Sequence, residues 1–180
     1  MESVDYGGSN TIAIIEKELS NALNEIIKAY LKRNKIGWTK SFSFYKIIKK
    51  YESKSQEIFN YLINNQTIQH YEVIVGVFYY KGFGVDKNEN IAFEWYIKAS
   101  QQNDINGHYE VGGCYYYGYG VNKNYKKAFE WYSKSANNGC AEGQNRLADC
   151  YYYGDGITQH VDKAFEWYSK AAKNENGYTF

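Results

Sequence analysis

Histidine and cysteine are the residue types of this chain that could bind a metal ion or act as nucleophiles, and it has three of each. A protein zinc site takes its ligands in close pairs, about two to five residues apart. No two of these residues have that spacing; they are His70, His108, Cys114, Cys140, Cys150 and His160. We therefore expect no metal site and no cofactor.

Pairs of glycines could indicate phosphate binding, because a glycine-rich loop can surround a phosphate with backbone N–H groups. Each pair here follows a segment with helical periodicity, lacks a third glycine and is not followed by Gly-Lys-Ser or Gly-Lys-Thr. We interpret the pairs as turns in which a left-handed glycine ends a helix. These structural glycines are Gly82, Gly84, Gly118, Gly120, Gly154 and Gly156.

Recurrent carboxylates give no stronger sign of catalysis. A glutamate precedes a lysine by four residues at three places: Glu94 and Lys98, Glu130 and Lys134, Glu166 and Lys170. Opposite charges at this spacing stabilise an exposed helix face by about 0.2–0.5 kcal/mol per pair. Because each of these carboxylates has a lysine partner, acid–base catalysis has no support here, and we expect no catalytic residue and no enzyme.

The same residues recur at a fixed interval. The segment Ala-Phe-Glu-Trp-Tyr at 92–96 returns at 128–132 and 164–168, 36 residues later each time, and the glycine turns recur with it. A period of this length indicates a helix pair copied along a stack. We expect Trp95, Trp131 and Trp167 to be structural residues on the packing face of each second helix.

Local chemistry supports two helices per copy. Apolar or small residues occur every third or fourth position in both segments, which is typical of amphipathic helices. Asn88 and Asn124 precede second helices, where their side-chain oxygens can accept backbone N–H groups. Gly76, Gly112 and Ala148 share one position of the first helix, and we interpret them as sites of close approach by the second.

With these features the repeats resemble the Sel1-like repeat family, whose units read A-x-x-x-L-G-x-x-Y-x-x-G-x-G-V and then K-A-x-x-W-Y-x-K-A-A-x-x-G. The second copy fits well, while the first departs at Tyr71 and the third at Ala148 and Thr158. The resemblance implies an all-α, TPR-like fold, a right-handed α–α superhelix or solenoid. Its three copies would span about 67–102, 103–138 and 139–174, within a repeat domain of residues 67–180.

Residues 1–66 lie outside the repeats, and we expect an N-terminal cap of about three helices after roughly ten disordered residues. Ile12, Ile15, Leu19, Leu23 and Ile26 begin an apolar stripe that predicts the first helix. A break at Gly37 and capping-box spacing of Ser53 and Gln56 predict the second and third helices. Similar repeat arrays follow protein kinase domains in fungi, but this chain has no kinase signature.

Tyrosine is unusually common, at 21 of 180 residues, and it gathers in the first helices. In solenoids of the family that the chain resembles, these helices line the concave face. Tyr79, Tyr115 and Tyr151 match the fixed core tyrosine of that family. The candidates to bind a partner are residues that point in other directions round these helices, several of which differ between copies: Val73, Val77, Tyr80, Lys81, Tyr109, Tyr116, Tyr117, Asn145, Asp149, Tyr152 and Tyr153. Two interpretations stay open for Tyr80, Tyr116 and Tyr152, which could instead fill space between repeats.

Composition narrows the class of partner and the compartment. The net charge is +1, with 21 basic and 20 acidic residues interspersed, so we do not expect nucleic acid or an anionic membrane as a partner. The start of the chain is acidic and no apolar run reaches membrane-spanning length, so we expect an intracellular, cytoplasmic protein. The repeats do not each carry a pair of cysteines, so we expect the three cysteines to be reduced thiols, as is usual in the cytoplasm.

The leading hypothesis is a non-catalytic scaffold or adaptor that binds a peptide or protein on the concave face. The alternative is a regulatory module of a kinase-type signalling pathway that acts through the N-terminal helices. A hydrolase, as suggested by secreted relatives with cell-wall chemistry, is less favoured because the cysteine pairs and a secretion signal are missing.

Overall fold

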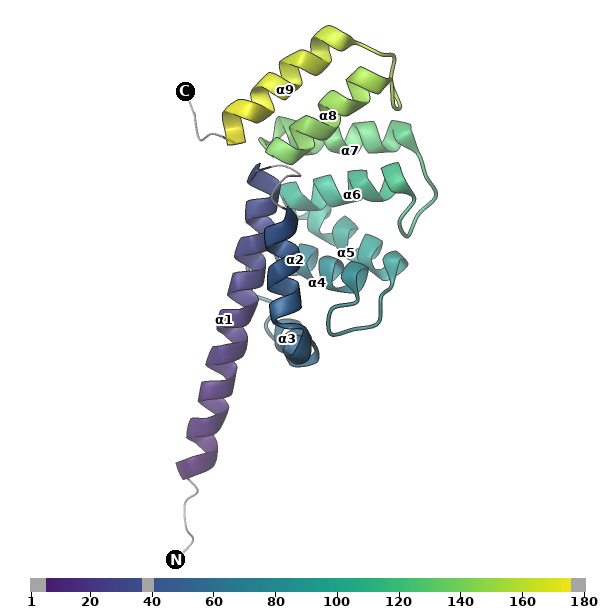
Figure 1. Ribbon diagram of the computed structural model, residues 1–180. Helices are drawn as coiled ribbons and strands as arrows, with labels where there is room; N and C mark the ends of the chain where they lie inside the picture. The colour runs from purple at the N-terminus through teal and green to yellow at the C-terminus, as the bar shows by residue number, and fades with distance from the viewer. Residues whose placement is uncertain (1–5, 37–40, 176–180) are drawn as a thin grey trace, which may run out of the picture.

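The computed structural model describes the backbone of residues 6–36 and 41–175, and the side chains of residues 11–32 and 44–174 (Figure 1). All regular structure in this part of the chain is helical. The helices are α1 (Tyr6–Ile36), α2 (Ser41–Lys50), α3 (Ser55–Asn64), α4 (Tyr71–Lys81), α5 (Glu89–Gln101), α6 (Ile105–Tyr117), α7 (Tyr125–Asn137), α8 (Ala141–Tyr153) and α9 (Val161–Glu175). A 3-10 turn at Glu52–Lys54 precedes α3.

Helices α4 to α9 form three antiparallel pairs stacked into an α–α solenoid, which confirms the predicted fold class (Figure 1). The predicted helix ends are confirmed too. Gly82, Gly118 and Gly154 follow the first helices with φ of 68°, 82° and 79°, the left-handed conformation that favours glycine. Asn88 and Asn124 accept the backbone N–H of the third residue after them, at 3.1 and 2.9 Å.

The second glycine of each turn allows the turn to pack closely against the backbone of the preceding unit. A Cβ on Gly120 would overlap the backbone carbonyl of Glu89, the first residue of α5, and a Cβ on Gly156 would overlap that of Tyr125 in α7. Gly84 meets the carbonyl of Ser55, the first residue of α3, in the same way. Helix α3 therefore takes the place of a second helix in front of the first repeat.

Aromatic contacts repeat the same relation between neighbouring units. Phe93 meets Tyr115 edge-on at 5.5 Å between ring centroids, and Phe129 meets Tyr151 at 5.4 Å. Phe59 of α3 meets Tyr79 edge-on at 5.6 Å. The apolar flank of the first repeat is thus covered by a helix that the repeat pattern does not include.

The small residues inside the first helices allow the close approach that we predicted. A Cβ on Gly76 would lie 2.6 Å from the ring of Tyr96, and one on Gly112 would lie 2.6 Å from the ring of Tyr132. Both tyrosines are buried, as is Ala148 in the third copy. In the first two pairs a large ring of the second helix thus packs directly against the backbone of the first.

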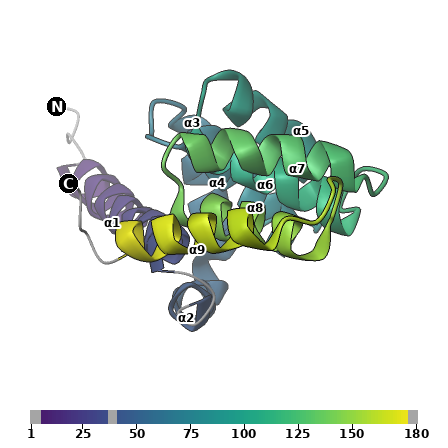
Figure 2. The ribbon, with the colours of Figure 1, turned by 90° about the horizontal axis from the view of Figure 1, so that it is seen from above.

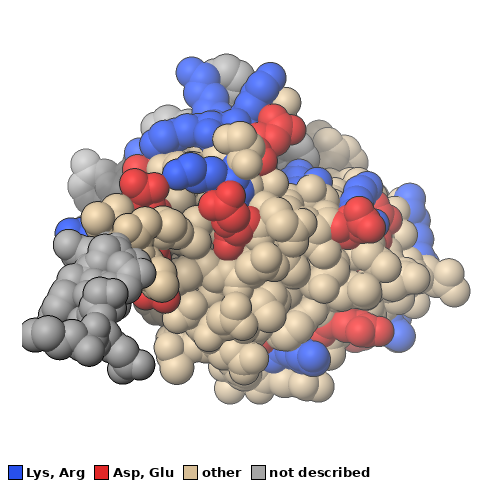
Figure 3. All heavy atoms as spheres, turned by 90° about the horizontal axis from the view of Figure 1, so that it is seen from below, with Lys and Arg blue, Asp and Glu red and all other residues tan. Residues whose placement is uncertain are grey.

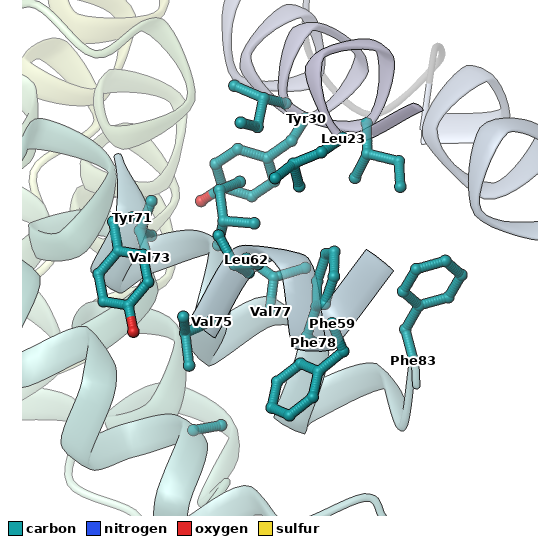
Figure 4. Close-up of a cluster of buried hydrophobic side chains, with 14 of the residues drawn as sticks. Leu23, Tyr30, Phe59, Leu62, Tyr71, Val73, Val75, Val77, Phe78 and Phe83 are labelled. Atoms are coloured by element: carbon teal, nitrogen blue, oxygen red, sulfur yellow. The ribbon is translucent and has the colours of Figure 1, made fainter. Parts of the chain in front are cut away.

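Helix α1 lies along the stack and covers part of the face that we expected to be open (Figures 1 and 2). Its C-terminal half contacts α2, α3, α8 and α9. In Figure 4, Leu23 and Tyr30 of α1 point toward Leu62 of α3 and toward Val73 and Val77 of α4. The Tyr30 hydroxyl also donates a hydrogen bond to Oε1 of Glu110 in α6, at 2.9 Å.

This arrangement corrects the prediction for the first repeat. Val73 and Val77 have exposed fractions of 0% and 2%, because the N-terminal helices pack over them, so neither can bind a partner at the surface. Residues 6–10 of the segment expected to be disordered belong to α1, while residues 1–5 and Gly37 lie outside the described part of the chain.

Two further local predictions are wrong. Ser53 does not cap α3, since α3 has no side-chain cap and the backbone N–H of Ser55 instead bonds the carbonyl of Glu52 in the 3-10 turn. The glutamate–lysine pairs are not formed among the described residues. Each lysine ammonium lies 4.0–4.1 Å from the ring centroid of the tryptophan three residues earlier: Lys98 over Trp95, Lys134 over Trp131 and Lys170 over Trp167.

Candidate functional site: a tyrosine-lined groove

A groove of about 300 Å³ opens on the face formed by the first helices of the repeats. Helices α4, α6 and α8 supply most of its lining, and α5 and α7 supply its floor. Six of the lining residues are tyrosines. The full lining is Tyr80, Lys81, Tyr96, Tyr109, Glu110, Gly113, Cys114, Tyr117, Tyr119, Tyr132 and Glu142.

Gly113 keeps the groove open. A Cβ at this position would meet only the Tyr132 hydroxyl, at 3.8 Å, which is an ordinary van der Waals distance, so no other element crowds this position. The equivalent residues in the first and third copies are Val77 and Asp149, which both carry a side chain at this position. The second repeat is therefore the one whose first helix leaves a hollow at this position.

Buried, neutral groups form the floor of the groove. Tyr96 and Tyr132 are almost fully buried, and Cys114 is 3% exposed. Burial raises the pKa of the Cys114 thiol far above its usual range, with smaller contributions from Glu110 and Glu89. Burial likewise raises the pKa of the Tyr132 hydroxyl. Neither group is charged near neutral pH, and a neutral thiol is a poor nucleophile.

A chain of aromatic rings forms one wall. The rings of Tyr80 and Tyr119 are 5.2 Å apart, those of Tyr119 and Tyr117 are stacked at 5.4 Å, and Tyr117 meets Tyr116 edge-on at 4.9 Å. Tyr116 lies behind this wall, where its hydroxyl donates to Asp155 at 2.7 Å. Burial, and then a hydrogen bond with Tyr119, raise the pKa of Tyr80 well above its usual range. The wall is neutral and held in place by ring contacts.

The charged residues of the lining are two carboxylates and one ammonium. Glu142, in the first turn of α8, is 3% exposed, and Glu110 is half-buried and accepts the bond from Tyr30. Lys81 is exposed at the last residue of α4, with its ammonium 4.9 Å from the ring centroid of Tyr80. The two carboxylates lie deeper than Lys81, and the partly buried guanidinium of Arg146 lies near enough to Tyr109, Tyr117 and Tyr132 of the lining to interact with them electrostatically.

The structure brings together some of the predicted site residues and separates others. Tyr80, Lys81, Tyr109 and Tyr117 line the groove. Asp149 lies beyond it on α8, where it pairs with Arg146 at 2.9 Å and accepts from the Tyr168 hydroxyl at 2.5 Å. The other predicted residues on α8, Asn145, Tyr152 and Tyr153, are also outside the lining, and Tyr152 and Tyr153 are exposed against each other.

Several lining residues were missed by the sequence analysis. The sequence analysis did not consider six of them as binding residues: Tyr96, Glu110, Cys114, Tyr119, Tyr132 and Glu142. Gly113 did carry a signal, because it is a glycine where the other copies have valine and aspartate. Glu142 carried none, since its burial depends on how α8 docks beside α6 and α1.

Other kinds of site find little support within residues 6–36 and 41–175. None of the described His, Cys, Asp or Glu residues form a group of three that could hold a metal ion. No described helix combines the length and apolar character needed to cross a bilayer. The face in Figure 3 carries basic and acidic residues near one another around a broad neutral area.

Comparisons with known proteins agree on the repeat. The Sel1 repeat family matches residues 73–104, 105–140 and 141–176. The chain is similar to a Sel1 repeat protein from Oxalobacter formigenes, with a TM-score of 0.62 and 25% identity over 73% of this chain and 57% of that one. No curated protein sequence matches it significantly.

A second solved structure is also similar, a protective antigen of uropathogenic Escherichia coli with an SLR fold. Its TM-score is 0.61 and its identity 25%, over 87% of this chain and 39% of that one. The chain thus spans 57% and 39% of the lengths of these two proteins.

Proposed function

The chain belongs to the Sel1 repeat family, and we propose that it is a non-catalytic scaffold or adaptor that binds a peptide or protein segment in the tyrosine-lined groove. The observation that carries this proposal is the hollow at Gly113, walled by tyrosines. A preformed wall of tyrosines offers a large contact area at low cost in side-chain entropy. The volume of about 300 Å³ suits one or two side chains of a partner rather than a whole domain.

The groups in the groove support binding rather than catalysis. The Cys114 thiol is held neutral, the tyrosine hydroxyls with raised pKa stay protonated, and Glu110 is engaged by Tyr30. We include a cytoplasmic location in the proposal, supported by three buried free cysteines, Cys114, Cys140 and Cys150, which suit a reducing compartment.

The test fills the hollow while leaving the fold intact. Gly113→Val places in the second repeat the residue that the first repeat already has, whereas Gly113→Ala adds only a Cβ with room around it. Peptides would be selected from a displayed random library against the wild-type chain, and their affinities measured by fluorescence anisotropy. We expect the valine variant to bind at least about tenfold more weakly and the alanine variant to bind within about threefold of wild type.

Circular dichroism melts provide the control. Both substitutions replace a helical glycine, which is unfavourable by up to about 1 kcal/mol relative to alanine, so neither should lower the melting temperature. Selected peptides that bind the folded valine variant as tightly as the wild type would show that the groove is not the binding site.

The second candidate is a regulatory module of a kinase-type signalling pathway acting through the N-terminal helices. It is supported by the N-terminal part of α1, which projects from the stack (Figure 1) and exposes Ile12, Ile14 and Ile15 at 60%, 57% and 47%. Cross-linking to a captured partner separates the candidates. Cross-links confined to α1 would favour this second function, and cross-links to α4 and α6 would favour the groove.

A further inference from the structure

We propose that the end of the stack formed by α8 and α9 (Figure 1) binds a repeat of the same type from another polypeptide, through the first helix of that repeat and its glycine turn. This surface is separate from the groove, so the proposal goes beyond the proposed function and does not depend on it. We call it the end face, and its residues are Tyr152 on α8 and Val161, Phe165 and Ala172 on α9.

The first argument is the phenylalanine of the end face, which has two equivalents inside the stack. Phe129 lies 36 positions before Phe165, and its ring meets that of Tyr151 in the next repeat edge-on at 5.4 Å. One copy earlier, Phe93 meets Tyr115 in the same way at 5.5 Å. At both interfaces, the ring at this position thus receives a tyrosine from the first helix of the following repeat.

The glycine turn of the following repeat makes a second contact. A Cβ on Gly156 would overlap the backbone carbonyl of Tyr125, which is the equivalent of Val161. A Cβ on Gly120 would overlap the carbonyl of Glu89 in the same way. The first residue of each second helix is therefore a position at which the next glycine turn packs on the backbone.

A tyrosine of the first helix makes a third contact with the same turn. Tyr116, the equivalent of Tyr152, donates a hydrogen bond from its hydroxyl to Asp155 at 2.7 Å. Asp155 is the residue between the two glycines of the following turn. Tyr80 is likewise hydrogen-bonded to Tyr119, which has that place in the preceding turn. The end face thus carries the equivalents of three groups that hold a following repeat.

In the described part of the chain, no following repeat covers these groups. The exposed fractions of Tyr152, Val161 and Phe165 are 45%, 55% and 74%. Ala172 is exposed as well, although its equivalent Ala136 is only 1% exposed beneath the next repeat. The end face therefore has the residues of an internal interface and the exposure of a surface.

The opposite end of the stack has a different chemistry. Helix α3 buries Phe59 against the first repeat and exposes the polar residues Gln56, Glu57 and Asn60. A unit that ends a repeat stack is expected to have a polar outer face of this kind. Helix α9 instead exposes the large apolar ring of Phe165. The contrast favours an end face that is covered by a partner.

The internal interfaces define the chemistry of that partner. It would present a helix with a tyrosine and, five residues later, the second glycine of a Gly-x-Gly turn, as Tyr151 and Gly156 do. A second copy of this chain does not offer such a unit at its free end, since a Cβ on Gly84 would overlap the carbonyl of Ser55. We therefore assign the end face to a repeat of a different polypeptide.

The experiment uses the third repeat as a probe. A fluorescein-labelled synthetic peptide of residues 139–174, which contains Tyr151, Asp155 and Gly156, would be titrated with the full chain and followed by fluorescence anisotropy. We expect saturable binding with a Kd below about 100 μM.

Variants of the chain assign the binding to the end face. Phe165→Asp should weaken it by at least about tenfold, and Tyr152→Phe, which removes only the hydroxyl, by about threefold. Both side chains are exposed, so the fold should persist. Ile14→Asp is the matched control, because it also replaces an exposed apolar residue, at 57%, by a charge, but on the projecting half of α1. It should bind as the wild type does, and so should Gly113→Val.

A variant of the probe tests the contact with the turn. Gly156 has a φ of 76°, and a Cβ there overlaps the carbonyl on which the turn packs. Gly156→Ala in the peptide should therefore weaken binding by at least about tenfold.

Three results would overturn the inference. They are a Kd above about 1 mM for the wild-type chain, equal binding by the wild type and Phe165→Asp, and dimers of the chain alone that are lost in Phe165→Asp. Analytical ultracentrifugation detects the last of these, which would assign the end face to a second copy. A loss of peptide binding in Gly113→Val would instead place the probe in the groove and also overturn the inference.

Discussion

Gly112 and Gly113 are neighbours in α6 with opposite surroundings. A Cβ on Gly112 would lie 2.6 Å from the buried ring of Tyr132, whereas a Cβ on Gly113 would meet only the Tyr132 hydroxyl at 3.8 Å. One glycine is required for the approach of two helices, and the other leaves space at the surface. A repeat can therefore use the same residue type for packing and for binding at adjacent positions.

This contrast gives a matched pair of variants. Gly112→Ala should destabilise the protein by about 1–3 kcal/mol, since overpacking against Tyr132 outweighs the gain in helix propensity. Gly113→Ala should leave stability unchanged or raise it by up to about 1 kcal/mol. Urea unfolding followed by circular dichroism measures both, and equal stability of the two variants would contradict the packing assigned to Gly112.

At the level of single residues, the sequence predicts packing positions better than binding positions. The glycine turns, the asparagine caps and the close approach at Gly76 and Gly112 follow from local chemistry and recur in register. Val73 and Val77 were misplaced because equivalent positions were treated alike, although α1 covers only some of them. Contacts between α1 and α4 join residues about fifty positions apart, and the 36-residue repeat pattern of the sequence does not reveal them.

Among the helices, α1 is divided into two halves with different surroundings. Ala22, Leu23, Ile26 and Tyr30 belong to the buried cluster, but the described residues before Leu19 are all exposed. The apolar stripe continues through both halves, so periodicity alone does not show which half is buried. Only the position of the stack beneath the second half distinguishes them.

The two halves should respond differently to the same kind of substitution. Leu23→Ala removes a side chain that is 1% exposed and should cost about 2–5 kcal/mol. Ile15→Ala, at 47% exposure on the projecting half, should change stability by no more than about 0.5 kcal/mol. Denaturant unfolding of the isolated chain checks this, and a large loss for Ile15→Ala would mean that the projecting half packs against the body.

At the scale of the whole molecule, the two ends of the stack are unequal. Helix α3 covers the first repeat through Phe59 and Ser55, in the manner of a preceding repeat. On α9 the corresponding residues, Val161 and Phe165, are 55% and 74% exposed. Phe165 is the equivalent of Phe93 and Phe129, which both pack on the next helix.

Hydrogen exchange should reflect this asymmetry. Because a repeat stack is stabilised by the contacts between neighbouring units, the end with fewer contacts opens at lower free energy. Amide protection should therefore be highest in α4 to α6 and lowest among the repeat helices in α9, as measured by hydrogen–deuterium exchange with mass spectrometry. Uniform protection from α4 to α9 would show that the stack opens as one unit.

Helix-pair solenoids are elastic, since each repeat touches only its neighbours and small rotations at successive interfaces add along the array. In this protein α1 contributes to the buried cluster at α4, bonds Glu110 on α6 and contacts α8 and α9. Bending that widened the face between α4 and α8 would have to detach α1 from one of them. Helix α1 therefore resists bending of the stack and holds the width of the groove nearly constant.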